Sequence, residues 1–76
     1  MEKVIVYSSN TCPYCVAAKD YLKENNVEFE ERNISTSAEA RNELIAKGYR
    51  GVPVISIDGE DIVGFDQARI AQLLGL

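Results

Sequence analysis

The run of residues 4–7, Val-Ile-Val-Tyr, is the sequence feature that most constrains what this chain can fold into. All four residues are apolar and either β-branched or aromatic, and no polar residue alternates with them. This pattern is typical of a strand that is buried on both faces, and such strands lie inside a sheet, parallel to a neighbouring strand. We therefore expect an α/β domain with residues 4–7 as a central strand.

The rest of the chain alternates between helical and strand patterns, so that the expected order of elements is β-α-β-α-β-β-α. The predicted strands are residues 4–7, 27–34, 54–57 and 61–63, and the predicted helices are residues 12–24, residues 36–48 and the segment after residue 66. The second strand is rich in charge, which is typical of a sheet edge, and Asp58-Gly59 favours a tight hairpin turn. The first three elements predict a βαβ unit with a right-handed crossover.

Polar residues that can cap a helix stand before each predicted helix. Thr11 is the expected cap of the first helix, with Pro13 in the first turn, where a missing N–H costs nothing. Thr36 with Glu39 forms a capping-box pattern, and Asp66 is the expected cap of the last helix.

Charge and residue usage exclude several classes of function. The 76 residues carry a formal charge of −4, whereas a nucleic-acid partner requires a basic surface, and the chain contains no histidine for a Ser-His-Asp or Cys-His pair. No apolar run approaches the roughly 20 residues that cross a bilayer, and the first residues lack the apolar segment of a signal peptide. We expect a cytoplasmic protein that binds neither nucleic acid nor membrane.

The pair Cys12 and Cys15, separated by Pro13 and Tyr14, lies where the first strand gives way to the first helix. Unpaired amides and the helix dipole at this position stabilise a thiolate, which is the form that attacks disulfides. Cys15 lies one helical turn further on and can close a disulfide with Cys12. We predict that Cys12 is the nucleophile and Cys15 the resolving thiol.

Three other interpretations of this cysteine pair have weaker support. A zinc site needs four ligands, and the chain has neither further cysteine nor histidine, so that only a second chain or an outside ligand could complete it. A structural disulfide would close too small a loop to constrain the unfolded chain much, and the cytosol would reduce it. Two inert buried thiols at a helix start, with a proline between them, are a rare coincidence.

The sequence Thr11-Cys12-Pro13-Tyr14-Cys15 after an apolar strand, followed by Val52-Pro53 and Gly64-Phe65-Asp66, resembles the dithiol glutaredoxins of the thioredoxin-like superfamily. The stretches around these motifs look like the short bacterial glutaredoxin-like type. The resemblance covers essentially the whole chain. It implies one domain over residues 1–76, with a four-stranded mixed sheet flanked by three helices.

The resemblance also implies an activity, namely glutathione-dependent reduction of protein disulfides and of glutathione mixed disulfides. Glutathione would be a co-substrate, with no tightly bound cofactor and no metal, and the partners would be glutathione and disulfide-containing proteins. We expect a monomer. The residues that support the active site would be Thr11, Pro13, Tyr14 and Pro53, with Pro53 in the cis form.

Four residues match the glutathione-binding positions of glutaredoxins. Val52 would offer its backbone N–H and C=O to the cysteinyl part of glutathione, as one rung of a β-ladder. Phe65 and Asp66 would bind the γ-glutamyl end with helix-start amides and an acidic side chain. Arg41 would meet the glycine carboxylate, and Lys47 and Arg50 lie near enough in sequence to extend a basic rim.

Two departures from the glutaredoxin pattern leave other functions open. Ser9 stands where many glutaredoxins have a basic residue, and Gly51 replaces the usual threonine before Val52-Pro53. In addition, the stretches Gly48-Tyr49-Arg50 and Gly64-Phe65 resemble the glutaredoxin-like hydrogen donors of ribonucleotide reductase, which take electrons from thioredoxin reductase. A further alternative is a binding module in which two chains hold an iron-sulfur cluster through Cys12 and two glutathione molecules, although relatives of that kind more often have small residues in place of Pro13 and Tyr14.

Overall fold

The structure, a computed structural model, describes residues 3–76. Its elements follow the order β-α-β-α-β-β-α that the sequence predicts. The strands are β1 (Val4–Ser8), β2 (Glu30–Asn33), β3 (Val54–Ile57) and β4 (Glu60–Val63), and the helices are α1 (Pro13–Glu24), α2 (Ala38–Ala46) and α3 (Gln67–Leu74). None of the helices within residues 3–76 is long and apolar enough to cross a membrane.

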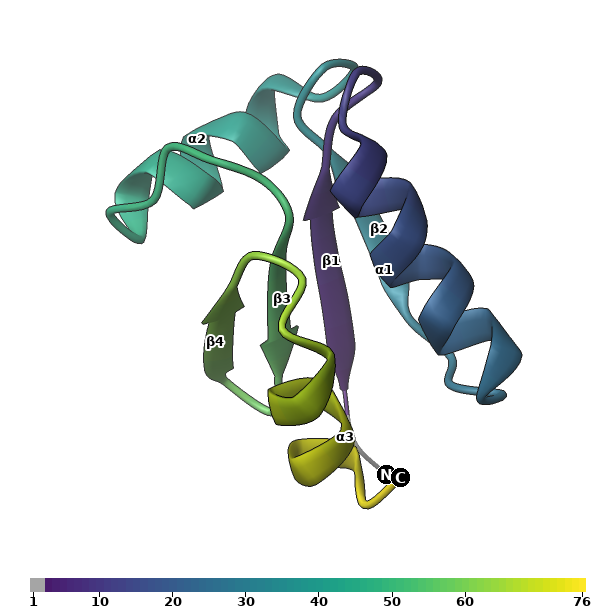
Figure 1. Cartoon of the computed structure of the whole chain (residues 1–76). Helices are drawn as coiled ribbons and strands as arrows, with labels where there is room; N and C mark the ends of the chain where they lie inside the picture. Colours follow the sequence, from purple (N-terminus) through teal and green to yellow (C-terminus); the bar gives the residue numbers. More distant parts are fainter. Residues whose placement is uncertain (1–2) are drawn as a thin grey trace.

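The apolar strand β1 lies inside a four-stranded sheet of order β2-β1-β3-β4 (Figure 1). It runs parallel to β2, with Ile5 opposite Glu30, and antiparallel to β3, with Val4 opposite Ile57. β3 pairs in turn with β4 in the antiparallel direction. The sheet is therefore mixed, and the predictions of a central first strand and of a charged second strand at the edge are confirmed.

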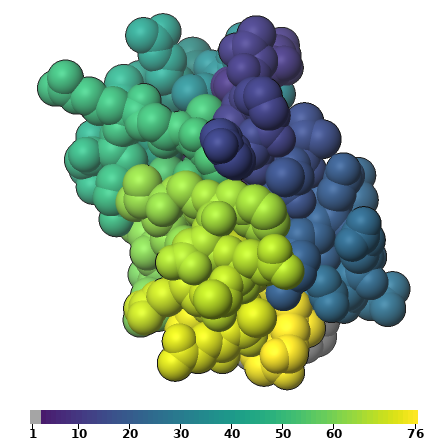
Figure 2. All heavy atoms as spheres, viewed as in Figure 1, coloured from purple at the N-terminus to yellow at the C-terminus, as the bar shows by residue number. Residues whose placement is uncertain are grey.

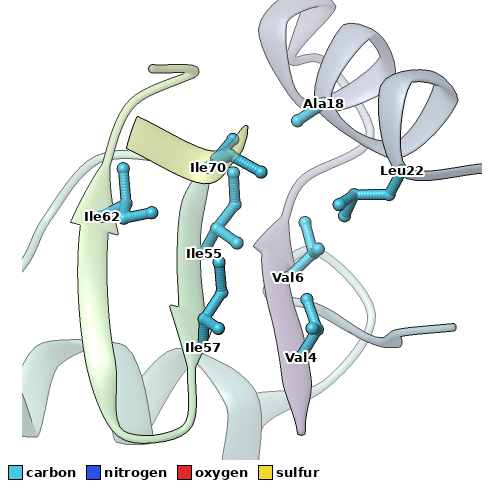
Figure 3. Packing of buried hydrophobic residues seen from close by; sticks show 8 residues of the cluster. All are labelled: Val4, Val6, Ala18, Leu22, Ile55, Ile57, Ile62 and Ile70. Atoms are coloured by element: carbon cyan, nitrogen blue, oxygen red, sulfur yellow. The ribbon is translucent and has the colours of Figure 1, made fainter. Parts of the chain in front are cut away.

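Helices cover both faces of this sheet, as the apolar run of β1 requires (Figure 1). α1 and α3 pack on one face, where Ala18, Leu22 and Ile70 meet the strand residues (Figure 3). The strand residues of this first core are Val4, Val6, Ile55, Ile57 and Ile62. α2 packs on the other face.

The second core is smaller and lies under α2. Leu44 of α2 meets Tyr7 and Val54, all three almost completely buried. Half-buried apolar residues surround this contact: Ile5, Ile34, Tyr49 and Val52. Because Tyr49 and Val52 belong to the loop that joins α2 to β3, this core fixes the loop against the sheet.

The second strand is shorter than predicted. Residues 27–34 were expected to form it, but only Glu30–Asn33 pairs with β1. Val27 and Phe29 are partly buried against the first core. These two apolar residues thus pack against the core without joining the ladder, and the strand begins only at Glu30.

Two of the three predicted caps are wrong by one residue. Cys12 caps α1 in place of Thr11, and Ser37 caps α2 in place of Thr36 by accepting a hydrogen bond from the amide of Ala40 at 3.2 Å. In each case the residue with extended backbone directly before the helix takes the role, since only there does the side chain reach the first-turn amides. Asp66 caps α3 as predicted.

The hairpin turn between β3 and β4 also agrees with the prediction. Asp58 and Gly59 have positive φ angles of 50° and 88°. Positive values at both central residues characterise a type I′ turn, which matches the right-handed twist of the paired strands.

Candidate active site

The two cysteines lie at the start of α1, just beyond the carboxyl end of β1, and form a disulfide with a Cα–Cα distance of 5.2 Å. Cys15 is completely buried, whereas Cys12 is half-buried and Tyr14 between them is exposed. An external disulfide can therefore reach the sulfur of Cys12 but not that of Cys15. This difference in access agrees with the predicted roles of nucleophile and resolving thiol.

Cys12 acts as the N-cap of α1 through its sulfur. The amide N–H of Cys15 donates a hydrogen bond to Cys12 Sγ at 3.1 Å, and Pro13 occupies the first helical position, where no N–H is needed. A negative charge on this sulfur would strengthen that hydrogen bond and would face the positive end of the helix dipole. The site can thus stabilise a thiolate although position 9 holds a serine and no basic side chain.

The loop before β3 brings a second segment to the sulfur. The peptide bond between Val52 and Pro53 is cis, as the resemblance implied, and the Val52 carbonyl oxygen lies 3.7 Å from Cys12 Sγ. Figure 2 shows the dark purple start of α1 against the green segments that follow α2. The backbone beside Pro53 is therefore a wall of the site.

A third segment adjoins this wall. The amide of Gly64 donates to the carbonyl of Pro53 at 2.8 Å, which holds residues 64–66 beside the cis-proline loop. Asp66 Oδ1 accepts from the amide of Arg69 at 3.2 Å, and the ring of Phe65 packs edge-on against Tyr21 with centroids 5.9 Å apart. Both residues thus have structural roles, while the Asp66 side chain stays exposed at the start of α3.

The basic residues Arg41, Lys47 and Arg50, which were expected to form one rim, lie in two different places. Arg41 and Arg50 line one groove of about 350 Å³ beside α2. Lys47, by contrast, forms an ion pair with Asp61 of β4, with Nζ 3.3 Å from Oδ1, and does not line that groove. Of these three basic residues, only Arg41 and Arg50 therefore line the groove.

Sequence reasoning missed a polar network under α1. Ser8, fully buried at the end of β1, donates to Glu31 Oε2 at 2.7 Å, and Lys19 Nζ lies 2.7 Å from the same oxygen. The hydrogen bond from Lys19, followed by that from Ser8, lowers the pKa of the Glu31 carboxyl. The only signal for this network was a serine directly after a buried strand, together with a glutamate in the adjacent edge strand.

The described residues offer few groups for a metal. Within residues 3–76, no cluster of three or more His, Cys, Asp or Glu side chains is arranged to hold an ion. The groups available for chemistry at the site are the two cysteines, the amides at the start of α1 and the carbonyl of Val52 beside Cys12.

A mixed sheet of this order, with helices on both faces, is the thioredoxin-like fold, and the dithiol at its first helix start defines a thiol-disulfide oxidoreductase. The particular family follows from the comparison with known proteins. The glutaredoxin family model matches residues 4–62, and the chain belongs to the glutaredoxin family.

Relatives of two kinds support this assignment. Glutaredoxin 3 of Escherichia coli K12 is 42% identical over 67 residues, covering 87% of this chain and 81% of that protein. The glutaredoxin-like protein NrdH of Lactococcus lactis IL1403 is 37% identical over 70 residues, covering 92% and 97%. Among solved structures, a mutant of the thioredoxin-like protein BC3987 superimposes with a TM-score of 0.92 at 41% identity, covering 99% and 97% of the two chains.

Proposed function

We propose that this oxidoreductase reduces protein disulfides and glutathione mixed disulfides, with glutathione as its reductant. The observation that carries the proposal is the 3.7 Å contact between Cys12 Sγ and the carbonyl of Val52 beside cis-Pro53. A cysteine bonded to Cys12 would lie along this backbone and could pair with it as an added strand does. Such pairing suits the cysteinyl unit of glutathione, because it uses only backbone groups.

The reaction with a protein disulfide has two exchange steps. The Cys12 thiolate attacks one substrate sulfur, a Cys12–substrate bond forms, and the other substrate sulfur leaves as a thiolate that takes up a proton. Cys15 then loses its proton and attacks Cys12 Sγ, which releases the second substrate thiol. The substrate gains two electrons and two protons, and the protein is left with the Cys12–Cys15 disulfide.

Glutathione would return the electrons. One glutathione thiolate opens the Cys12–Cys15 disulfide, a second attacks the resulting mixed disulfide, and glutathione disulfide leaves. A glutathione mixed disulfide of a protein enters the same cycle at Cys12 alone. Glutathione is thus a co-substrate, and the scheme uses no tightly bound cofactor.

Local groups are proposed to bind glutathione, since the net charge of −4 repels an anionic tripeptide at long range. Val52 would hold the cysteinyl backbone. The amides at the start of α3 and the exposed carboxylate of Asp66, next to Phe65, would bind the γ-glutamyl end. Arg41 would pair with the glycine carboxylate.

The second candidate reductant is thioredoxin reductase. The 37% identity to a protein named NrdH over nearly the whole of both chains favours it, as do Ser9 and Gly51 at positions where many glutaredoxins differ. Here a protein surface, rather than a tripeptide, would meet Cys12.

A paired assay separates these candidates. Disulfide reduction is followed with glutathione and glutathione reductase in one tube, and with NADPH and thioredoxin reductase in the other. We expect turnover in the first tube, and turnover in the second tube alone would overturn the assignment of glutathione.

Two variants test the division of roles. Cys12→Ser is expected to abolish all turnover. Cys15→Ser is expected to keep reduction of glutathione mixed disulfides while losing that of protein disulfides, and equal loss from both variants would contradict the roles.

A further inference from the structure

We propose that the groove beside α2 is a docking site for acidic segments that flank the disulfide of a protein substrate. The inference rests on the proposed function and narrows its substrate class. Arg41 and Arg50 line this groove with Ile34, Leu44, Ile45 and Tyr49, and its volume is about 350 Å³. The groove would make the protein select disulfides with aspartate or glutamate nearby.

The two arginines give the groove a positive charge. Four of the basic residues are engaged in ion pairs: Lys19, Arg32, Lys47 and Arg69. Arg41 and Arg50 are both exposed, and no ion pair found within residues 3–76 includes either of them. Two free guanidinium groups at one groove, in a chain of net charge −4, form a local site for carboxylates.

The rest of the lining suits a peptide rather than a small anion. Ile45 is 54% exposed, and Tyr49 and Ile34, which also line the groove, are half-buried, so that part of the lining is apolar. The aliphatic stem of a glutamate, or an apolar neighbour, would cover this surface while the carboxylate meets an arginine. A glycine carboxylate at Arg41 would leave Arg50 without a partner, whereas a segment with two acidic residues would use both arginines.

A series of contacts connects the lining of the groove with the reacting sulfur. The amide of Ile34 donates to the carbonyl of Ser8 at 2.8 Å, so that the groove begins where β1 ends. Val52 belongs to the same apolar cluster as Ile34 and Tyr49, and its carbonyl contacts Cys12. An extended chain advances about 3.3–3.6 Å per residue, so that a few substrate residues next to the attacked cysteine would reach the groove.

A second hollow, between β2 and α2, has a mainly acidic lining. It is lined by four glutamates, Glu30, Glu31, Glu39 and Glu43, and by Arg32, which pairs with Glu30 and Glu43. This hollow therefore disfavours an acidic segment, whereas the arginine groove attracts one.

The test uses reduced full-length protein without glutathione, so that the proposed glutathione site plays no part. The probes are short peptides with one internal disulfide, flanked on both sides by two glutamates or by two glutamines. Acid quenching and chromatography give the second-order rate constant for each probe. At low salt we expect the glutamate probe to react about fivefold faster, equivalent to about 1 kcal/mol, and the ratio to approach one in 1 M salt, where the Debye length is about 3 Å.

Matched variants test whether the groove causes the difference in rate between the glutamate and glutamine probes. Arg41→Gln and Arg50→Gln are each expected to lower it to about twofold. Lys23→Gln makes the same change in net charge in the last turn of α1, at the end away from α2 (Figure 1), and is expected to preserve the ratio. A ratio near one in the unaltered protein, or an equal fall in Lys23→Gln, would overturn the proposal.

A binding measurement separates this inference from the proposed function. A fluorescent glutamate-flanked peptide with serines in place of its cysteines cannot react, and its anisotropy reports docking alone. Binding that weakens in Arg50→Gln but not in Lys23→Gln supports the groove even if no probe is reduced, in which case the proposed function fails. Reduction of both probes without such binding would refute the docking site and leave the oxidoreductase activity intact.

Discussion

The hydrogen bond between Ser8 and Glu31 gives the sharpest test of how the site is supported. Replacing Ser8 by alanine removes a fully buried hydroxyl that donates to Glu31 Oε2 at 2.7 Å. Because Glu31 also pairs with Lys19 of α1, the substitution loosens the connection between the end of β1 and the helix that carries the dithiol.

The expected loss of stability follows from how far the Ser8–Glu31 hydrogen bond is shielded from water. A hydrogen bond to a charged group contributes about 1.5–3 kcal/mol to the free energy of unfolding. The Glu31 side chain is 38% exposed, so water replaces part of the lost interaction, and its pair with Lys19 adds only about 0.2–1 kcal/mol. We expect Ser8→Ala to lower the free energy of unfolding by about 1–1.5 kcal/mol at pH 7, which is a fall in Tm of about 4–12 °C for a domain of this size.

The loss should depend on pH in a defined direction. The hydrogen bonds from Lys19 and Ser8 lower the pKa of Glu31 in the folded state, so their stabilisation is present above the ordinary value of 4.5 and disappears as pH falls through the lowered value. The difference between Ser8→Ala and the unaltered protein should therefore be full at pH 7 and should shrink well below pH 4.5.

Thermal unfolding of the oxidised protein, followed by circular dichroism at pH 7 and in acid, measures both effects. Ser9→Ala, a substitution of the same kind at the next residue, is the control and is expected to change stability by less than about 0.5 kcal/mol. A double-mutant cycle of Ser8→Ala with Glu31→Gln should give a coupling energy of about 1 kcal/mol. An equal loss at both pH values, or no coupling, would refute the reasoning.

Two further predictions concern the thiolate and the core. In Cys15→Ser, ultraviolet absorbance against pH should show a pKa of Cys12 below the ordinary thiol value of about 8.5, because the helix amides favour the thiolate; a value at or above 8.5 would contradict this. Ile70→Ala should lower the free energy of unfolding in urea by about 2–5 kcal/mol, because Ile70 of α3 is fully buried against the sheet. Leu76→Ala, at a residue that is 51% exposed, should cost little, and similar losses from both variants would show that the core is misassigned.

Much of the site could be predicted from the sequence because its signals are local. The apolar run at residues 4–7, Pro13 in a first helical turn and the spacing of Cys12 and Cys15 each depend on neighbours within one strand or one helical turn. The predicted order of elements is confirmed for the same reason.

Cap positions and the length of β2 were not predictable to the residue. Thr11 and Cys12 are neighbours, as are Thr36 and Ser37, and the backbone angle that selects the cap is set by where the loop enters the helix. Val27 has the pattern of a strand, but its packing against the first core is a tertiary contact.

By itself, therefore, the sequence determined the order of strands and helices and the chemistry of the dithiol, because hydrophobic periodicity and helix-start amides act over a few residues. Only the tertiary structure decided which residues far apart in the sequence come together. Val52 reaches Cys12 across 40 residues, Glu31 reaches Ser8 across 23, and Arg41 and Arg50 come to share one groove. These contacts depend on how α1, α2 and the cis-proline loop pack on the sheet, and no short-range pattern encodes that packing.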